Sequence, residues 1–219
     1  MKVKNRMSEN PRTVGLDTSV TEAFSLMKEN NIRRLPVVDK DKVVGIITIS
    51  DLNQASPSMA TTLSIHELNY LLAKTKIKDV LPKKQKLLTI GPENYIETAA
   101  RLMRFNKVSG LPVIDEHEKL VGIITETDIF DAFIDILGVS RPHTRIDFYT
   151  SDRVGTIADI TGMIAEKGKN IVNTVVFYDK KYNKYKMVIR IEELECQDVV
   201  DALKDRGYEV ESVIITQPE

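Results

Sequence analysis

Apolar residues recur along the chain with two different periods, and together they predict a mixture of helices and short strands. From Val20 to Met27 they recur at three- and four-residue spacing, which predicts an amphipathic helix that opens with a capping box, Ser19-x-x-Glu22. The β-branched runs LPVVD (35–39) and VVGIIT (43–48) predict two adjacent strands with a tight turn between them. The region therefore reads as strand, helix, strand, strand, helix.

This arrangement occurs twice. Shifting the chain by 76 residues places 13–39 on 89–115 with ten of 27 positions identical, and a shift of 77 places 43–51 on 120–128 with six of nine identical. Unrelated segments match at roughly one position in twenty, so we infer a duplication. Between the copies, Ser64-x-x-Glu67 predicts the start of a further helix after a polar, turn-rich segment.

The pattern changes after the proline-containing joint at 139–143. Strands are predicted at 145–150, 171–178, 185–191 and 210–215, with one helix ending at Gly168 and another at Gly207. The order βαββαβ is typical of a ferredoxin-like unit, in which one antiparallel sheet carries both helices on one face. The predicted fold class is mixed α/β (α+β), with these parts: repeat one 1–54, a helical linker 55–74, repeat two 75–138 and a C-terminal domain 144–219.

Both repeats resemble a known family in the runs that follow their predicted helices. The runs 35–39 and 45–51 (LPVVD, GIITISD) and 111–115 and 122–128 (LPVID, GIITETD) resemble a tandem CBS-domain pair, or Bateman module. The sequence DRVG at 152–155 is similar to the DRxG turn of ACT domains. The combination resembles the acetoin utilisation (AcuB) group. Proteins with these two modules are, as a family, regulators rather than catalysts.

Composition and charge narrow the choice of function. Lys and Arg number 31 against 32 Asp and Glu, so no overall field gathers nucleic acid or anionic membrane. No apolar run approaches the ~20 residues of a membrane helix, and no apolar stretch follows the N-terminal lysines. We therefore expect a cytoplasmic protein that binds neither nucleic acid nor membrane.

No catalytic or metal-binding pattern stands out, so we expect a non-enzyme that requires no cofactor and no metal. Cys196 is the single cysteine, which excludes an intrachain disulfide and a cysteine-cluster zinc site. It starts a predicted helix and is expected to be a semi-buried packing residue. His66, His117 and His143 lie in separate segments and are expected at the surface.

The motif Thr-x-x-Asp, where a strand enters a helix, suits a nucleotide. One carboxylate can accept hydrogen bonds from both ribose hydroxyls, while the threonine hydroxyl and the amides of the helix start face a phosphate. The base would occupy an apolar slot between each first strand and the segment before each proline. The same motif is also a plain N-cap, and one residue can be both.

The family resemblance implies a role for individual positions. It places Asp51 and Asp128 on ribose, Thr48 and Thr125 near phosphate or ribose, and the backbone around Leu35 and Leu111 on adenine. The predicted nucleotide-binding residues are Thr13, Val14, Arg33, Arg34, Leu35, Pro36, Thr48, Ser50, Asp51, Thr89, Ile90, Ser109, Gly110, Leu111, Pro112, Thr125, Thr127 and Asp128.

The copies differ just before proline, where Arg33-Arg34 in copy one corresponds to Ser109-Gly110 in copy two. Two guanidinium groups suit polyanion binding, in an asymmetric pair of sites where they serve one nucleotide or reach both. A solvated basic patch or a salt bridge to a partner subunit is an equal alternative.

The C-terminal domain has a second set of candidate residues. ACT domains bind small effectors, often amino acids, at a subunit interface, and the resemblance places such a site at Asp152, Arg153, Gly155, Asn170 and Ile171. The favoured alternative is that Gly155 only makes the turn and the domain only dimerises.

Together these patterns predict a regulatory, homodimeric ligand sensor whose repeat pair binds AMP, ADP, ATP or cyclic di-AMP. The ligand would shift the packing of the repeats and thereby act on a partner such as a metabolic enzyme. A link to acetoin or acetyl-CoA metabolism rests on the resemblance alone. The alternatives are an interaction subunit with empty pockets and an amino-acid sensor that acts through the ACT domain.

Overall fold

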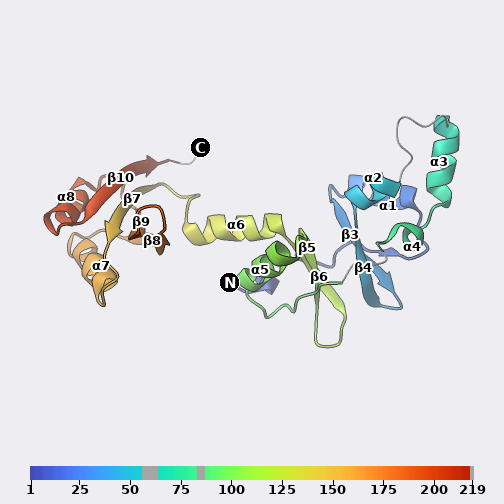
Figure 1. Cartoon of the computed structure of the whole chain (residues 1–219), viewed down its shortest axis with the longest axis horizontal. Coiled ribbons are helices and arrows are strands. Elements are labelled where there is room, and N and C mark those ends of the chain that lie inside the picture. The colour runs from blue at the N-terminus through green and yellow to red at the C-terminus, as the bar shows by residue number, and fades with distance from the viewer. Residues whose placement is uncertain (56–63, 83–86, 218–219) are drawn as a thin grey trace. The chain divides into compact units, whose positions relative to one another are not determined.

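The computed structural model describes residues 1–55, 64–82 and 87–217, which form two compact units, Met1–Phe130 and Asp131–Glu219 (Figure 1). The first unit contains both repeats. Its elements are a 3-10 helix Val3–Asn5, β1 Ser8–Glu9, β2 Val14–Gly15, α1 Val20–Glu29, β3 Arg34–Asp39, β4 Lys42–Thr48, α2 Ile49–Ala55, α3 Ile65–Lys74, α4 Ile77–Val80, α5 Ile96–Asn106, β5 Gly110–Ile114 and β6 Leu120–Thr125. Helix α6 Glu126–Leu137 begins in this unit and continues into the second.

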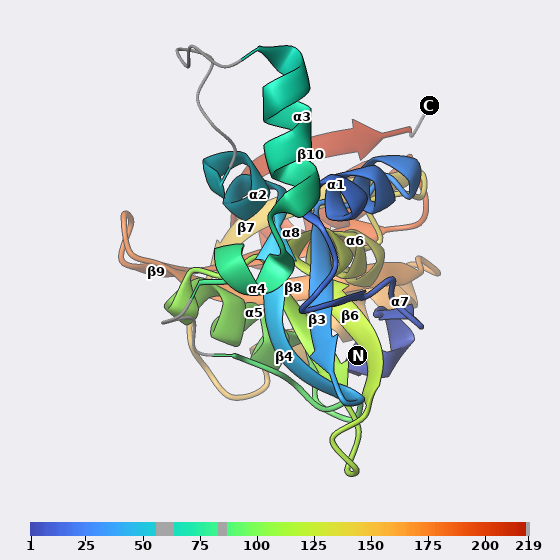
Figure 2. The same ribbon diagram turned by 90° about the vertical axis from the view of Figure 1, so that its right-hand side faces the viewer.

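Repeat one has the predicted order of elements. Strand β2 runs parallel to β3, which pairs antiparallel with β4, while α1 and α2 gather at one end of these strands (Figure 2). The side chains that α1 was predicted to bury include Val20, Ala23 and Met27, and these pack with Leu35 and Ile47 of the strands. Ser19 accepts the Glu22 amide at 3.1 Å, which is the serine half of the predicted capping box.

Repeat two follows the same plan with a shorter first strand. Strands β5 and β6 pair antiparallel in a register equivalent to that of β3 and β4, and the first strand is reduced to a single parallel bridge between Ile90 and Val113. Part of the predicted linker, 56–63, lies outside the described residues. The rest forms α3, which opens with the predicted capping box of Ser64 and Glu67.

The two repeats exchange the segments that precede them. The amide of Val3 donates to the carbonyl of Asn94 in repeat two, whereas the amide of Ile77 donates to the carbonyl of Thr18 in repeat one. Both apolar side chains are fully buried. The predicted repeats 1–54 and 75–138 are therefore interleaved, because each is completed by a short segment that comes before the other.

A side chain near the end of each exchanged segment packs against a glycine, and the two glycines occupy equivalent positions in the repeats. A Cβ on Gly45 would lie 2.9 Å from the Leu81 side chain, and one on Gly122 would lie 2.5 Å from Met7 Sδ. Each glycine thus leaves the space that the incoming side chain fills. The exchange also repeats an ion pair, since Lys78 contacts Asp17 at 2.7 Å and Lys4 contacts Glu93 at 2.6 Å.

The second unit has the predicted βαββαβ order. Its strands form one antiparallel sheet in the order β10-β7-β9-β8, and both helices pack on one face of it through Ile160, Ile164 and Leu203 (Figure 1). Gly168 and Gly207, with φ of 68° and 81°, follow the two helices as predicted. The elements are β7 His143–Thr150, α7 Thr156–Glu166, β8 Ile171–Asp179, β9 Lys184–Ile191, α8 Gln197–Asp205 and β10 Glu209–Thr216.

One polar residue of this unit contradicts its predicted place. His143 was expected at the surface, but it begins β7 and is only 2% exposed. Its Nδ1 lies 2.7 Å from the carbonyl of Arg141, so the imidazole is buried with a local backbone partner. Cys196 is the predicted packing residue, since it is buried among the apolar side chains of the core and burial raises the pKa of its thiol.

Replacement of Ile77 should test the exchange directly. We expect Ile77→Ala to lower the free energy of unfolding of the first unit by roughly 2–5 kcal/mol, because the substitution empties a fully buried site. The neighbouring Lys78→Ala removes only an exposed ion pair and should leave the urea midpoint almost unchanged. Equal, small effects of both substitutions would mean that 75–81 does not complete repeat one.

Candidate functional site

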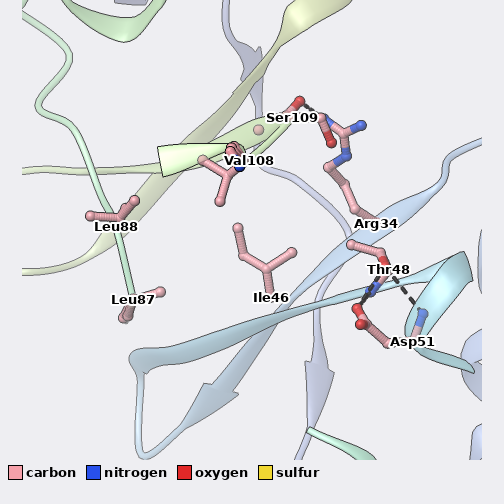
Figure 3. Close-up of a pocket in the computed structure, with 10 residues that line it drawn as sticks. Arg34, Ile46, Thr48, Asp51, Leu87, Leu88, Val108 and Ser109 are labelled. Atoms are coloured by element: carbon pink, nitrogen blue, oxygen red, sulfur yellow. Dashed lines mark hydrogen bonds between the residues drawn. The ribbon is translucent and has the colours of Figure 1, made fainter. Parts of the chain in front are cut away.

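Two cavities in the first unit lie where the repeats meet, and each takes residues from both. Cavity 1 has a volume of about 180 Å³ and cavity 2 about 580 Å³. Cavity 1 is lined by Arg34, Ile46, Thr48, Asp51, Leu87, Leu88, Lys107, Val108, Ser109 and Gly110 (Figure 3). Cavity 2 is lined by Ser8, Pro11, Arg12, Asn30, Asn31, Ile32, Arg33, Arg34, Pro36, Ile123, Thr125, Thr127 and Asp128.

The two linings are equivalent under the repeat. In cavity 1, Thr48 and Asp51 of repeat one face 107–110 and 87–88 of repeat two, and in cavity 2 their counterparts in repeat two face 31–34 and 11–12. Each acid-bearing motif therefore shares its cavity with the pre-proline segment of the opposite repeat. A molecule that fills either cavity would contact both repeats at once.

Both Thr-x-x-Asp motifs form the same closed hydrogen-bond ring. The backbone amide and the hydroxyl of Thr48 donate to Asp51 Oδ2 at 2.8 and 2.6 Å, and the Asp51 amide returns to Thr48 Oγ1 at 3.3 Å (Figure 3). The corresponding distances for Thr125 and Asp128 are 2.7, 2.7 and 3.5 Å. The N-cap interpretation is thus confirmed, while Oδ1 takes no part in the ring and keeps its capacity to accept other hydrogen bonds.

Ten of the eighteen predicted nucleotide-binding residues line one cavity or both. They are Arg33, Arg34, Pro36, Thr48, Asp51, Ser109, Gly110, Thr125, Thr127 and Asp128. The other eight lie outside both linings. Leu35, Leu111, Pro112, Val14 and Ile90 are buried, while Thr13 and Ser50 are exposed and Thr89 is half-buried.

The sequence analysis missed the residues just upstream of each first strand. Leu87 and Leu88 line cavity 1, and the equivalent Pro11 and Arg12 line cavity 2. A detectable signal was present, because the repeat extends upstream with a different offset: KVKN at 2–5 corresponds to KIKD at 76–79. Pro11 and Arg12 come after the first exchanged segment in the sequence, and Leu87 and Leu88 come after the second, so each pair lines a cavity with the acid of the opposite repeat.

The cavities differ in charge. Cavity 2 contains Arg12, Arg33 and Arg34 against the single carboxylate of Asp128, whereas cavity 1 contains Arg34 and Lys107 against Asp51 and has the apolar Leu88 at the position of Arg12. Arg34 lines both. Its guanidinium donates to the carbonyl of Ser109, and burial lowers the pKa of the Arg34 side chain.

A third cavity, cavity 3, lies in the second unit and has a volume of about 380 Å³. It includes two of the five predicted effector residues, Asn170 and Ile171. It is lined by Arg141, Pro142, Asn170, Ile171, Val172 and Glu192. Asp152, Arg153 and Gly155 lie outside this lining, and Gly155 adopts φ of 89° immediately before α7, which fits its role as a turn residue.

Two further searches returned nothing for the parts of the chain that the structure describes. No three His, Cys, Asp or Glu side chains in these parts are grouped so as to hold a metal ion. None of the described helices has the length and apolar character required to cross a bilayer.

The repeats match a family model. The model of the CBS domain matches residues 3–58 and 77–135, which together make up more than half of the chain. The chain belongs to the CBS domain family. A CBS domain-containing protein of Dictyostelium discoideum is 37% identical over 143 residues, which cover 65% of this chain and 97% of the relative.

Several solved structures are similar to part of this chain, and two of them contain adenosine ligands. The domain pair of MJ0100, in complex with 5′-methylthioadenosine and S-adenosyl-L-methionine, is 29% identical at a TM-score of 0.50, covering 61% of this chain and 95% of that one. CBSX2 in complex with AMP is 29% identical at a TM-score of 0.50, covering 62% and 97%. A Vibrio cholerae protein assigned as acetoin utilization protein (AcuB) is 28% identical at a TM-score of 0.51, covering 64% and 94%.

The hydrogen-bond ring should contribute to stability without any ligand. Thr48→Val and Thr125→Val each remove the hydroxyl that donates to the acid, and we expect each to lower the free energy of unfolding by about 0.5–2 kcal/mol. Ser50→Ala, at an exposed position of the same helix as Asp51, is the control and should cost nothing measurable. Urea unfolding without nucleotide provides the measurement, and unchanged stability of the valine variants would refute the ring.

Proposed function

We propose that the first unit is a sensor of adenine nucleotides and that the chain acts as a regulator rather than a catalyst. The observation that carries this proposal is the pair of equivalent cavities. Each is lined by the acid of one repeat and by the segment before proline of the other. Similar CBS pairs have been solved with AMP, 5′-methylthioadenosine and S-adenosyl-L-methionine, all of which contain adenosine.

The lining of cavity 1 suggests how such a ligand would be held. Leu87, Leu88 and Val108 offer apolar surface for the base, and the free oxygen of Asp51 would accept hydrogen bonds from the ribose hydroxyls. Arg34, which lines this cavity together with Lys107, would contact a phosphate through its guanidinium. Cavity 2 repeats this plan with more room and more positive charge, so it should prefer the more highly phosphorylated nucleotide.

Sensing follows from the position of the cavities between the repeats. A ligand that contacts both repeats favours the packing it binds more tightly, and it can shift the packing only by that difference in affinity. Within this proposal, AMP, ADP, ATP and cyclic di-AMP are the candidate ligands. A metabolic enzyme, in acetoin or acetyl-CoA metabolism as the similarity to AcuB suggests, is the candidate partner.

Substitution of the two acids tests the nucleotide proposal. We expect Asp51→Asn and Asp128→Asn each to weaken binding of AMP at one site by roughly 10- to 100-fold, because a charge-assisted hydrogen bond to ribose is lost. The amide oxygen can still accept from the threonine of the ring, so the N-cap should survive. Isothermal titration calorimetry measures the affinity for AMP at both sites. The matched control ligand is 2′-deoxy-AMP, which lacks one of the two ribose hydroxyls.

Two results would contradict the proposal. If none of these adenosine compounds gives a heat signal or raises the melting temperature of the wild-type chain, the pockets are empty and the interaction-subunit alternative is favoured. If AMP binds but neither substitution weakens it, the acids do not hold ribose.

A second candidate function belongs to the second unit, for which we propose an ACT-type domain. Cavity 3 is lined by both Arg141 and Glu192, and a lining that offers one cation and one carboxylate suits the zwitterion of a free amino acid. Stabilisation of the chain by an amino acid in a thermal-shift panel, lost in Arg141→Gln, would support this function. The absence of such stabilisation would leave dimerisation as the role of the domain.

We also propose that the second unit forms a homodimer through strand β10. This strand is at the edge of the described sheet and exposes three consecutive apolar residues, Val213, Ile214 and Ile215, without a charge among them. Unpartnered edges in native sheets are usually protected by charge, so this edge favours pairing with a second copy. Ile214→Lys should therefore convert a dimer to a monomer in sedimentation velocity.

The control for the dimer is Glu166→Lys, which places a lysine at an exposed position at the end of α7 and changes the charge by even more than Ile214→Lys does. It should remain dimeric. A wild-type chain that sediments as a monomer at tens of micromolar, or an Ile214→Lys variant that remains dimeric, would refute pairing through β10.

A further inference from the structure

One pair of positions that differs between the copies lies where the two repeats meet. Arg34 and Gly110 occupy equivalent positions, two residues before Pro36 and Pro112. In the structure they contact each other: a Cβ on Gly110 would lie 2.5 Å from Arg34 Nη1 and 2.9 Å from Arg34 Cδ. The glycine of one copy thus provides the space in which the arginine of the other copy lies.

One arginine occupies this junction, and it lines both cavities. Its guanidinium donates to the carbonyl of Ser109 (Figure 3). The same carbonyl also accepts the amide of Glu126 at 3.2 Å. In repeat one the equivalent carbonyl, that of Arg33, accepts the amide of Ile49 at 2.9 Å. No arginine side chain donates to it from the described part of repeat two, because the residue that corresponds to Arg34 there is Gly110. The duplicated unit therefore has two cavities and one shared cation.

Charged groups of both repeats act on Arg34. Burial lowers the pKa of its guanidinium, while Glu126 and Asp128 of repeat two favour the charged form and Arg33 of repeat one opposes it. If Arg34 turns toward a phosphate in one cavity, it leaves the other with its remaining cations only. These are Lys107 in cavity 1, and Arg12 and Arg33 in cavity 2.

We propose that Arg34 couples the two cavities, so that a phosphate bound in one lowers the affinity of the other for a second phosphate. This inference rests on the proposed nucleotide function and specifies the sign of the coupling between the two sites. Because a single guanidinium cannot make the same bidentate contact with two phosphates on opposite sides, the coupling is negative for nucleotides. Adenosine has no phosphate, so its two binding events should be independent.

Single-site variants of the full chain separate coupling from intrinsic difference. Asp51→Asn leaves cavity 2 as the main site, and Asp128→Asn leaves cavity 1. Calorimetry with AMP gives the affinity of each site alone, and their product is compared with the product of the two stepwise constants of the wild type. We expect the wild-type product to be weaker by about fivefold or more with AMP and unchanged with adenosine.

A second substitution in each background assigns the coupling to Arg34. Arg34→Gln should weaken AMP in both single-site variants, whereas the matched Arg33→Gln should weaken it only where cavity 2 is the remaining site, since Arg33 lines cavity 2 and not cavity 1. In Arg34→Gln with both sites intact, the fivefold difference should disappear. Loss of AMP affinity in only one background, or equal products in the wild type, would overturn the coupling.

Gly110→Ala provides an independent test that keeps the arginine. Its methyl group would displace the flexible end of Arg34 from Ser109, so AMP binding should weaken in cavity 1 and strengthen in cavity 2. Changes of the same sign in both cavities would overturn the proposal, even if Arg34→Gln folds poorly. If no adenosine compound binds to the wild type, the nucleotide function itself fails, and this result is distinct from independent binding at two sites.

Discussion

The reciprocal burial of Val3 and Ile77 is the interaction on which the rest of the first unit depends. Each side chain belongs to a segment that precedes one repeat and lies in the core of the other, held by matching backbone hydrogen bonds. Because the chain crosses between the repeats in this way twice, residues just after each crossing are delivered to the opposite acid. The cavities are therefore a product of the interleaving, and neither repeat could form one alone.

Duplication produced two cavities of one design, and a few substitutions then made them unlike. Arg12 corresponds to Leu88, and Arg33 to Ser109, so cavity 2 has two arginines without a charged counterpart in cavity 1, which is also the smaller of the two. The scaffold that both share is unchanged, as the near-identical rings around Asp51 and Asp128 show. Selectivity between related ligands can thus arise from the pre-proline and upstream positions without disturbing the caps.

Features that depend on neighbours in sequence were predictable, and features that depend on distant parts of the chain were not. The periodicity of α1, the pairing of β3 with β4, and the Thr-x-x-Asp caps all arise within a few residues, so the sequence alone identified them. The pairing of Asp51 and Asp128 with the segment before proline of the opposite repeat depends on how the exchanged segments cross. The offset between the two repeats in the sequence does not indicate that pairing. The predicted surface position of His143 was wrong for a similar reason. Its burial results from the tertiary packing of β7, which no local sequence pattern indicates.

The interleaving also determines what happens when the gene is cut. A fragment that ends before residue 75 would keep Gly45 but lose the Leu81 side chain that covers it, and a fragment that starts after residue 9 would leave Gly122 equally bare. Each fragment would expose the site at which the missing strand or helical turn normally packs. The same segment of another molecule could then bind there. Truncation is therefore expected to yield swapped oligomers rather than two independent half-modules.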